Sequence, residues 1–439
     1  MSLINTLQSG ASGLTAIGAS LGVIGDNIAN INTTGYKGSR ANFADLMPQF
    51  LGGAGQVGRG TQLSNVSRSF GQGALQATGS VLDVGVQGNG WFKVNNGGEA
   101  FYTRDGHFNL DKDNFVVSSS GLNLQGYQAS NGVVTSTLGD LQLDTGDMMP
   151  QVTSTITLDA NLAIPDPANS NGDLLALDFT GGATIAEMSG AADFSTSVTV
   201  YDTLGRPHDV SVMYEYDQTA GSWNYKAVID AGDTDMAGAT PGNGVAILEG
   251  TVSFDTSGQL ASVTQTTPAT MPAWTWPGAA PFSFTLDMGV DSTGAATNGS
   301  LTQVGLDGTS ATNAISQDGF TVGAVTGLQV SADGTIVANF DNGQDRLIGQ
   351  LALARFAAEG GLEGMGGNLF RASMASGEAA MGAAGVGGRG DTIAYALEGS
   401  NVSLEDEFVQ MIQAQRAYQA NAGTIRTADE TLQELVNLV

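Results

Sequence analysis

The chain has 439 residues, 41% hydrophobic and 13% charged, with 63 glycines against 10 prolines, a balance that excludes a disordered chain and predicts two or three β-rich domains. Asp and Glu outnumber Lys and Arg by 43 to 15, and the resulting net charge of −28 argues against nucleic acid or anionic lipid as a partner. The absence of cysteine excludes disulfide frameworks, thiolate metal sites and cysteine nucleophiles.

The first thirty residues are expected to form a helix with an apolar seam at coiled-coil spacing. Alternating steps of four and three residues reach one glycine, Gly10, and otherwise only Leu and Ile, namely Leu3, Leu7, Leu14, Ile17, Leu21, Ile24, Ile28 and Ile31. No basic stretch opens the chain, and Gly, Ser and Thr interrupt its apolar residues, so we expect neither a cleaved signal peptide nor membrane insertion. The seam therefore needs a partner helix to bury it.

Turn-forming residues follow this helix. Residues 32–37 read NTTGYK, a composition that favours turns and left-handed backbone. We expect a linker over 36–70, which contains the glycine-rich run GGAGQVGRG at 52–60. Because no strand precedes this run and no Lys-Ser or Lys-Thr ends it, we interpret it as a flexible hinge and not as a phosphate-binding loop.

The long middle of the chain is predicted to be β-structure. Residues 197–201 and 210–216 alternate in polarity and flank the turn LGRP at 204–207, which predicts a hairpin. Shorter segments of the same kind predict strands at 81–84, 91–94, 115–117, 328–331 and 335–338.

A second helix with an apolar seam is predicted at the C-terminus. Ser403 is placed to cap it, and three acidic residues at 405–407 fall at the positive end of the helix dipole. The same alternating steps leave polar residues at Gln415 and Asp429 and otherwise give a seam that includes Leu404, Phe408, Met411, Tyr418, Ile425, Leu432 and Val436.

Two seams at opposite ends of one chain favour a nested arrangement. We expect a mainly β protein with terminal α-helices, in which 1–35 and 401–439 form a helical coiled-coil domain. A linker over 36–70 would lead to a β-rich domain made of 71–150 and 318–400, and that domain would carry an inserted β-rich domain over 151–317. Apolar surface that the helix pair leaves uncovered would be offered to other copies of the chain.

The residues offer little for catalysis. Only His107 and His208 are available as imidazole bases, and both lie in polar turn or strand-edge sequence, which favours solvated side chains. Residues 111–114 (DKDN) lack the glycine and glutamate of a calcium loop, so no metal or cofactor is expected. The tripeptide Arg-Gly-Asp at 389–391 leaves a secreted adhesin as an alternative from a different class.

Several longer motifs carry a family resemblance. ANINTTGYK at 29–37, GNGWF at 88–92 and YTRDGHF at 102–108 resemble the rod and hook family of bacterial flagellar axial proteins. MIQAQRAYQAN at 411–421 and ADETLQELVNL at 428–438 resemble its C-terminal end, and Asn114 stands where the family often has a turn glycine. The matching motif residues are Asn30, Asn32, Thr34, Gly35, Tyr36, Lys37, Gln415, Arg416 and Asn421.

The resemblance implies a structural subunit with no catalytic activity that assembles with copies of itself into a helical tube. The long middle favours a hook-type member, whose curved tube would act as a flexible joint passing motor torque to the filament, over the shorter distal rod type. Implied partners are rod, hook cap and hook–filament junction proteins and the type III export apparatus. The implied location is the extracellular part of the flagellum, reached without a cleaved signal peptide.

Overall fold

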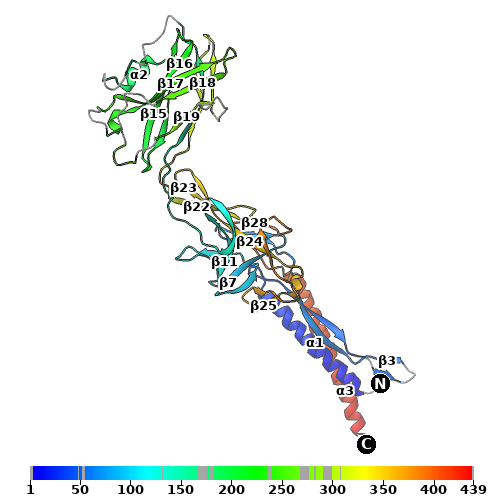
Figure 1. Cartoon of the computed structure of the whole chain (residues 1–439). Coiled ribbons are helices and arrows are strands. Elements are labelled where there is room, and N and C mark those ends of the chain that lie inside the picture. The colour runs from blue at the N-terminus through cyan, green and yellow to red at the C-terminus, as the bar shows by residue number, and fades with distance from the viewer. Residues whose placement is uncertain are drawn as a thin grey trace. The chain divides into compact units, whose positions relative to one another are not determined.

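The computed structural model describes residues 3–47, 49–51, 55–130, 132–166, 174, 176–177, 182–235, 240–266, 276–280, 283–289, 299–306 and 308–437. The chain divides into two compact units, which are described separately (Figure 1). The terminal unit consists of Met1–Thr145, Val325–Asn339 and Asp345–Val439, and the inserted unit of Gly146–Ala324 and Phe340–Gln344. The architecture is mostly β, with a long helix at each end of the chain, as the sequence predicts.

The terminal unit contains the two long helices and a large sheet. Helix α1 covers Leu3–Ala29 and α3 covers Leu404–Asn437, and the two helices pack along each other. The strands before the inserted unit are β1 (Ser39–Asp45), β2 (Gln49–Leu51), β3 (Gly55–Val57), β4 (Thr61–Arg68), β5 (Leu75–Ala77), β6 (Val84–Gln87), β7 (Trp91–Asn96), β8 (Glu99–Thr103), β9 (Phe108–Leu110), β10 (Val116–Ser118), β11 (Asn123–Ser130) and β12 (Val133–Asp140). Those after it are β22 (Val325–Val330), β23 (Thr335–Phe340), β24 (Asp345–Arg355), β25 (Glu363–Gly366), β26 (Leu369–Arg371), β27 (Ala380–Ala383), β28 (Asp391–Ala394) and β29 (Ala396–Glu398), with the short helix η4 at Glu359–Gly361.

Strands from both ends of the chain build the sheet of the terminal unit. Its order is β22-β23-β24-β11-β7-β8-β26-β25, with β9, β10, β12 and β27 attached to this path. Two further pairs, β28 with β6 and β29 with β5, also join late strands to early ones. An aromatic cluster fills its core, where Trp91 meets Phe370 edge to face with ring centroids 5.0 Å apart. Residues hundreds of positions apart in sequence therefore share one core.

The inserted unit is a β-sandwich with one short helix. Its elements are β13 (Thr155–Ala163), α2 (Ile185–Ala191), β14 (Phe194–Tyr201), β15 (Pro207–Asp217), β16 (Ser222–Asp230), η3 (Ala231–Asp233), β17 (Gly244–Phe254), β18 (Leu260–Thr266), β19 (Thr285–Asp287), β20 (Ser300–Val304) and β21 (Ala311–Gln317). One sheet has the order β14-β15-β16-β17-β18, and the other has β13 between β19 and β20, with β21 also paired to β13. An apolar core joins the two sheets, and its largest side chains, Trp223, Trp276, Tyr214 and Tyr225, are fully buried.

Most of the predicted strands are confirmed. The predicted hairpin is β14 and β15, which pair antiparallel from Phe194↔Tyr214 to Tyr201↔Pro207. Segment 81–84 is shifted, because the strand there begins at Val84 and runs to Gln87. Asn114 has φ 61°, so asparagine does occupy a left-handed turn position.

Residues 36–70, predicted to be a linker, contain paired strands instead. Strands β1 and β4 pair antiparallel along their whole length, from Ser39↔Arg68 to Asp45↔Thr61, and form a ribbon that packs on α1. Of the predicted hinge at 52–60, residues 52–54 lie outside the described residues, and 55–57 form β3, which pairs with β2. The ribbon strands lack a clean polar–apolar alternation, since Phe43, Leu63 and Val66 remain exposed, so local patterning did not reveal them.

Candidate assembly surface

The two terminal helices approach each other closely where α1 carries small residues. A Cβ placed on Gly10 would lie 2.9 Å from Cγ1 of Ile425, and one placed on Gly13 would lie 3.1 Å from Nδ2 of Asn421. Both glycines are buried, as is Ala16. The glycine that interrupts the predicted seam is therefore a contact point between the helices, where small residues allow close packing.

The seam of α1 is unevenly buried. Ile24 is 4% exposed, while the remaining described seam side chains are half-buried, namely Leu7, Leu14, Ile17, Leu21, Ile28 and Ile31. The side chain of Leu3 lies outside the described residues. Pairing with α3 therefore leaves part of the α1 seam open to solvent.

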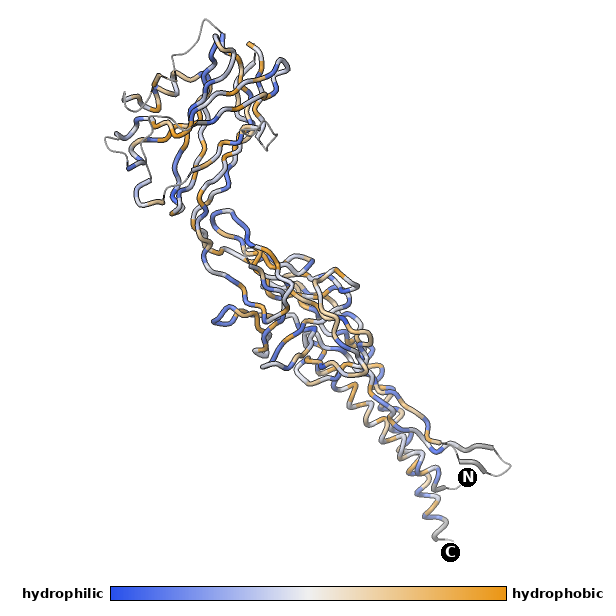
Figure 2. The backbone as a smooth tube through the Cα atoms, in the orientation of Figure 1, coloured by the Kyte–Doolittle hydropathy of each residue, from blue (hydrophilic) through white to orange (hydrophobic). Residues whose placement is uncertain are grey.

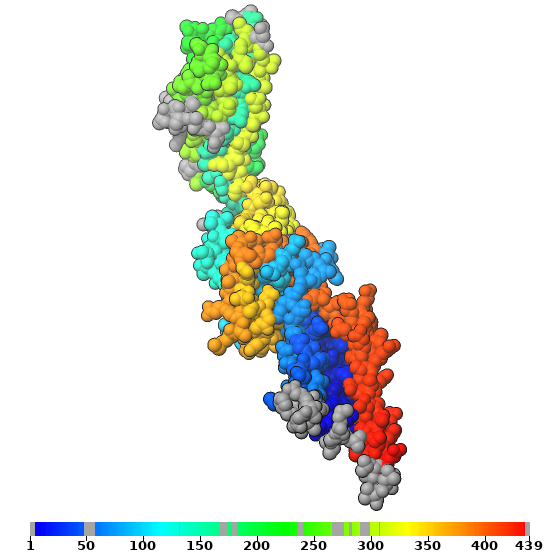
Figure 3. Space-filling view, turned by 90° about the vertical axis from the view of Figure 1, so that its right-hand side faces the viewer, coloured from blue at the N-terminus to red at the C-terminus, as the bar shows by residue number. Residues whose placement is uncertain are grey.

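Helix α3 is more exposed than α1. Of its predicted seam, Met411, Ile425 and Leu432 are half-buried, whereas Leu404, Phe408 and Tyr418 are exposed; the side chain of Val436 lies outside the described residues. Figure 3 shows this helix, in red, running along the outside of the N-terminal helix. Much of the α3 surface is thus without a partner within the terminal unit.

Two further apolar side chains of α3 are exposed that the seam pattern missed. Val409 is 54% and Ile412 is 52% exposed, next to Phe408 at 47%. Leu404, Phe408 and Ile412 are spaced by four residues, so they form one row along the helix. We call Leu404, Phe408, Val409, Ile412 and Tyr418 the open face of α3. A search for rows at spacing four, in addition to the seam, finds Ile412 from the sequence but not Val409, and Figure 2 shows hydrophobic residues recurring along both helices.

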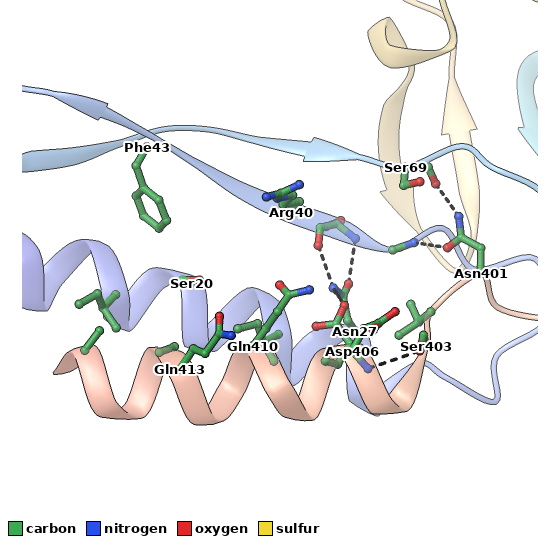
Figure 4. Close-up of a pocket in the computed structure, with 18 residues that line it drawn as sticks. Ser20, Asn27, Arg40, Phe43, Ser69, Asn401, Ser403, Asp406, Gln410 and Gln413 are labelled. Carbon is green, nitrogen blue, oxygen red and sulfur yellow. Dashed lines mark hydrogen bonds between the residues drawn. The ribbon is translucent and has the colours of Figure 1, made fainter. Parts of the chain in front are cut away.

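A groove of about 640 Å³ runs between α1, α3 and β1 (Figure 4). Apolar residues such as Ile24 and the 46% exposed Phe43 line it together with polar Asp406, Gln410 and Gln413. Figure 4 shows Phe43 directed from β1 toward the helices. The groove thus offers both apolar contact and hydrogen-bonding groups.

Asn27 lines one end of this groove and forms hydrogen bonds to two other elements. Its side-chain amide donates to the carbonyl of Ser39 at 2.8 Å and to Oε1 of Glu407 at 3.0 Å, and its Oδ1 accepts from the Ser39 amide at 2.8 Å. One buried asparagine therefore joins α1, β1 and α3. Burial raises the pKa of the Glu407 carboxyl, and the hydrogen bond from Asn27 only partly opposes this rise.

The first family motif lies at the junction between the helices and the sheet. Gly35 has φ 67°, and a Cβ there would lie 2.6 Å from the amide nitrogen of Asp105, so glycine is required. Thr34 donates its hydroxyl to Asp105 at 3.0 Å. Tyr36 donates to Asp26 at 3.2 Å, and burial together with the Asp26 carboxylate raises the pKa of Tyr36 to about 12.

The remaining motif residues are more dispersed. Asn30 donates to the carbonyl of Asp26 at 2.9 Å and so helps to end α1, whereas Asn32 is exposed. On α3, Gln415 and Arg416 are exposed, while Asn421 donates to the carbonyl of Ala417 at 3.1 Å and faces Gly13. The motif therefore does not form one site.

Lys37 takes part in a buried ionic cluster. Its Nζ lies 2.7 Å from Oε1 of Glu398, and Nη1 of Arg104 lies 3.2 Å from Oε2 of the same carboxylate. The side chains of Lys37 and Glu398 are fully buried, and that of Arg104 is 2% exposed. Burial lowers the pKa values of Lys37 and Arg104, and Glu398 opposes both shifts by favouring the charged forms.

The two histidines do not form a catalytic constellation. His107 lies 2.7 Å from Asp83 and is 45% exposed, whereas His208 is only 10% exposed and stacks on Trp276 at 4.0 Å, so the prediction of a solvated His208 was wrong. Within the described ranges, no group of three or more His, Asp or Glu is arranged to hold a metal ion. In the Arg-Gly-Asp tripeptide, Arg389 donates back to the carbonyl of Ala383 at 3.0 Å.

Helix α1 is also long and apolar enough, over Asn5–Ala29, to span a bilayer by length and composition alone. The same test is met by core helices of soluble proteins. Here α1 packs on α3, β1 and β4, which cover part of its apolar surface.

Family models match four stretches of this chain, and known proteins match nearly all of it. The flagella basal body rod protein family matches residues 7–37, and the D1 domain of flagellar hook protein FlgE/F/G matches 85–171. The flagellar basal body protein FlaE D2 domain matches 169–320, and the C-terminal domain of flagellar basal body rod FlgEFG proteins matches 394–438. The flagellar hook protein FlgE of Salmonella typhimurium is 34% identical over 440 residues, covering 99% of this chain and 100% of the relative. The chain belongs to the flagellar hook protein family.

Other hook proteins also match this chain over nearly its full length. The hook protein of Escherichia coli K12 is 35% identical, covering 97% of this chain and 98% of the relative, and that of Treponema pallidum is 33% identical, covering 99% and 100%. A crystal structure of Helicobacter pylori flagellar hook protein FlgE2 superposes with a TM-score of 0.51 at 16% identity, covering 74% of this chain and 100% of that one, which shows a shared fold. The predicted resemblance is thus confirmed, and the protein is a structural subunit of the flagellar hook; the distal rod alternative is not favoured.

Proposed function

We propose that this hook subunit assembles with copies of itself into a curved helical tube, through the terminal helices and the groove beside them. The open face of α3 carries the proposal, because a stripe of exposed Leu, Phe, Val, Ile and Tyr on a long helix is unusual for a protein that acts alone. A contact between one surface of a subunit and a different surface of the next does not close on itself, and so builds an open helical polymer.

The arrangement of the chain supports a division of labour within such a polymer. Residues 1–35 and 401–439 would form the coiled-coil domain, whose assembly residues are the seam side chains and the open face of α3. Residues 71–150 and 318–400 would form one β-rich domain, and 151–317 would form the other. This proposal places the polymer contacts on the helices and leaves the sandwich core of the inserted unit intact.

The hook relatives support the finer functional assignments. The tube would act as a flexible joint that passes motor torque to the filament, without catalytic activity, cofactor or metal. Its partners would be rod, hook cap and hook–filament junction proteins, and the type III export apparatus would deliver it to the cell exterior without a cleaved signal peptide. The net charge of −28 is unsuited to nucleic acid and supports protein partners.

Negative-stain electron microscopy tests the proposal directly. The full-length chain is compared with a chain trimmed to residues 35–401, each incubated alone and with sheared tubes of the full-length chain as seeds. We expect curved tubes to form or elongate only with the full-length chain. Tubes from the trimmed chain, or a failure of the full-length chain to elongate seeds or form tubes, would contradict assembly through the terminal helices.

A further inference from the structure

The ionic cluster around Glu398 places two cations in the interior against a single carboxylate. Within the part of the chain that the structure describes, Glu398 is the only acidic residue at ion-pair distance from either Lys37 or Arg104. The carboxylate also accepts a hydrogen bond from the Gly73 amide at 2.8 Å. Lys37 donates further to the Gly71 carbonyl at 2.9 Å, and Arg104 donates to the Gly88 carbonyl at 2.8 Å.

The members of this cluster come from opposite ends of the chain. Glu398 lies 361 positions after Lys37 and 294 positions after Arg104. Its backbone is equally tied to early residues, because the Glu398 carbonyl accepts from the Gly35 amide at 2.7 Å and β29 pairs with β5. The early half of the terminal unit thus supplies both cations, and the last segment before α3 supplies the anion.

Removing the carboxylate from this arrangement would leave two like charges buried without an ion-pair partner, with only the longer-range Coulomb attraction of Glu359 acting on both. A buried charge without its partner is strongly unfavourable, since desolvation is no longer repaid by Coulomb attraction. Closing the early strands around Lys37 and Arg104 in their native positions is therefore strongly unfavourable without Glu398.

We propose that Glu398 is a closing residue, which makes folding of the terminal unit conditional on the arrival of the C-terminal segment. Because a chain is made from its N-terminus, Lys37 and Arg104 exist long before Glu398, and the terminal unit stays open until the chain is nearly complete. Closure then positions the helices, because Asn401 accepts from the Gly38 amide at 2.8 Å and donates to the Ser69 carbonyl at 2.8 Å just before α3 begins. An incomplete chain therefore cannot present a native helix pair to another subunit.

The charge dependence is tested by substitutions in the full-length chain. Glu398→Gln keeps the size of the side chain but removes its charge, and Glu363→Gln is the matched control, because Glu363 belongs to an exposed pair with Arg371 in the same unit. We expect Glu398→Gln to lower the folding equilibrium constant of the terminal unit about a hundredfold or more, and Glu363→Gln to change it less than about threefold. Hydrogen exchange measured by mass spectrometry reports each unit separately, and the inserted unit is expected to be unaffected.

A triple variant separates the charge from simple packing. Lys37→Met, Arg104→Met and Glu398→Gln together remove every charge of the cluster at similar volume, and we expect most of the lost stability to return. Equal behaviour of Glu398→Gln and Glu363→Gln would overturn the proposal. A triple variant as unstable as Glu398→Gln would also overturn it, because packing and not charge would then control closure.

The order of folding is tested by pulse-labelling hydrogen exchange during refolding of the wild-type chain. Closure that depends on Glu398 predicts that amides of β6, β7 and β8 become protected together with those of β28 and β29. Stable protection of β6 to β8 before 391–398 would show that the early strands close on their own, and would contradict the proposal.

Discussion

The sandwich of the inserted unit and the terminal helix pair differ in how far they bury their apolar side chains. In the sandwich, Trp223, Tyr214, Tyr225 and Ile156 are fully buried by residues of the same unit. In the helix pair, Ile24 is buried but Phe408, Val409 and Ile412 stay about half exposed. The sandwich buries its large apolar side chains within a single chain, whereas the helix pair buries its exposed side chains only when another molecule covers them.

The sandwich therefore supplies stability to the single subunit, whereas the helix pair supplies a surface for binding other subunits. A saturated core resists unfolding independently of concentration, while an open helical face gains its burial only through association. Substitutions in the two regions should therefore be read out by different experiments, stability for the sandwich and assembly for the helices.

The largest effect is expected from the open face of α3. The double substitution Phe408→Ser and Ile412→Ser should prevent tube formation at concentrations where the wild-type chain assembles, because burying the exposed half of each side chain contributes about 1 kcal/mol at every subunit contact. Stability of the free chain should change by less than about 0.5 kcal/mol, since both side chains are exposed there. Electron microscopy and chemical denaturation measure the two quantities, and Gln419→Ser, an exposed position on the same helix, is the control. Normal tubes from the double variant would show that the open face of α3 is not needed for assembly.

Trp223→Ala should give the converse result. Trp223 is fully buried and donates its indole N–H to Gln303 at 3.1 Å, so its loss should destabilise the inserted unit by about 3–5 kcal/mol. The helix pair should keep its hydrogen-exchange protection, because Trp223 packs in the core of the inserted unit. Loss of protection in α1 or α3 would mean that the two regions are not independent.

Two glycines of α1 test whether close packing controls the pairing of the helices. Gly22→Ala should stabilise α1 by about 0.5–1 kcal/mol through helix propensity, since a Cβ there has no neighbour within 4 Å. Gly10→Ala gains the same propensity but pushes against Ile425, so it should be less stable than Gly22→Ala by about 2 kcal/mol. Circular dichroism of both variants during thermal unfolding measures the difference. If both glycines respond alike, the close approach of the helices does not control their pairing.

The smallest effect is a pH dependence in the inserted unit. Burial alone would raise the pKa of Asp202, but hydrogen bonds from the backbone and side chain of Arg206 and from the Leu204 amide outweigh it and lower the pKa below 3.8. A lowered folded pKa gives stability that is present above pH 3.8 and is lost as the pH falls through the folded value.

Asp202→Asn should therefore lower the free energy of unfolding of the inserted unit by about 1 kcal/mol at neutral pH. The variant should also lose less stability than the wild-type chain as the pH falls. Denaturation of the inserted unit between pH 2 and 7 checks this, with Asp147→Asn, an exposed position of the same unit, as a comparison for general charge effects. An unchanged acid slope would show that Asp202 does not contribute in this way.

Sequence patterns predicted those parts of the fold that depend on local spacing. The seams located both terminal helices, and alternation around 204–207 located the β14–β15 hairpin. The β1–β4 ribbon was missed because polar residues dominate it and its apolar side chains are exposed. Pairing between its two strands and packing on α1, and not local polarity, specify that ribbon.

The assembly surface was predictable only in part for a related reason. The alternating seam found Leu404, Phe408 and Tyr418, but it passed over Val409 and Ile412, which lie outside a two-helix contact. The Glu398 cluster was not visible at all, because its partners are hundreds of residues apart and Lys37 entered only through the family motif. A buried ion pair leaves no periodic signal in a sequence.

Hydrogen exchange of the free subunit and of assembled tubes shows whether neighbouring subunits complete the helix pair. If the helix pair is completed by assembly, amides of α1 and α3 should gain strong protection in the tube, while β14 to β18 of the sandwich keep the protection they have in the free subunit. Equal protection of α1 and α3 in both states would show that the helix pair is already complete in one chain, and would contradict the account.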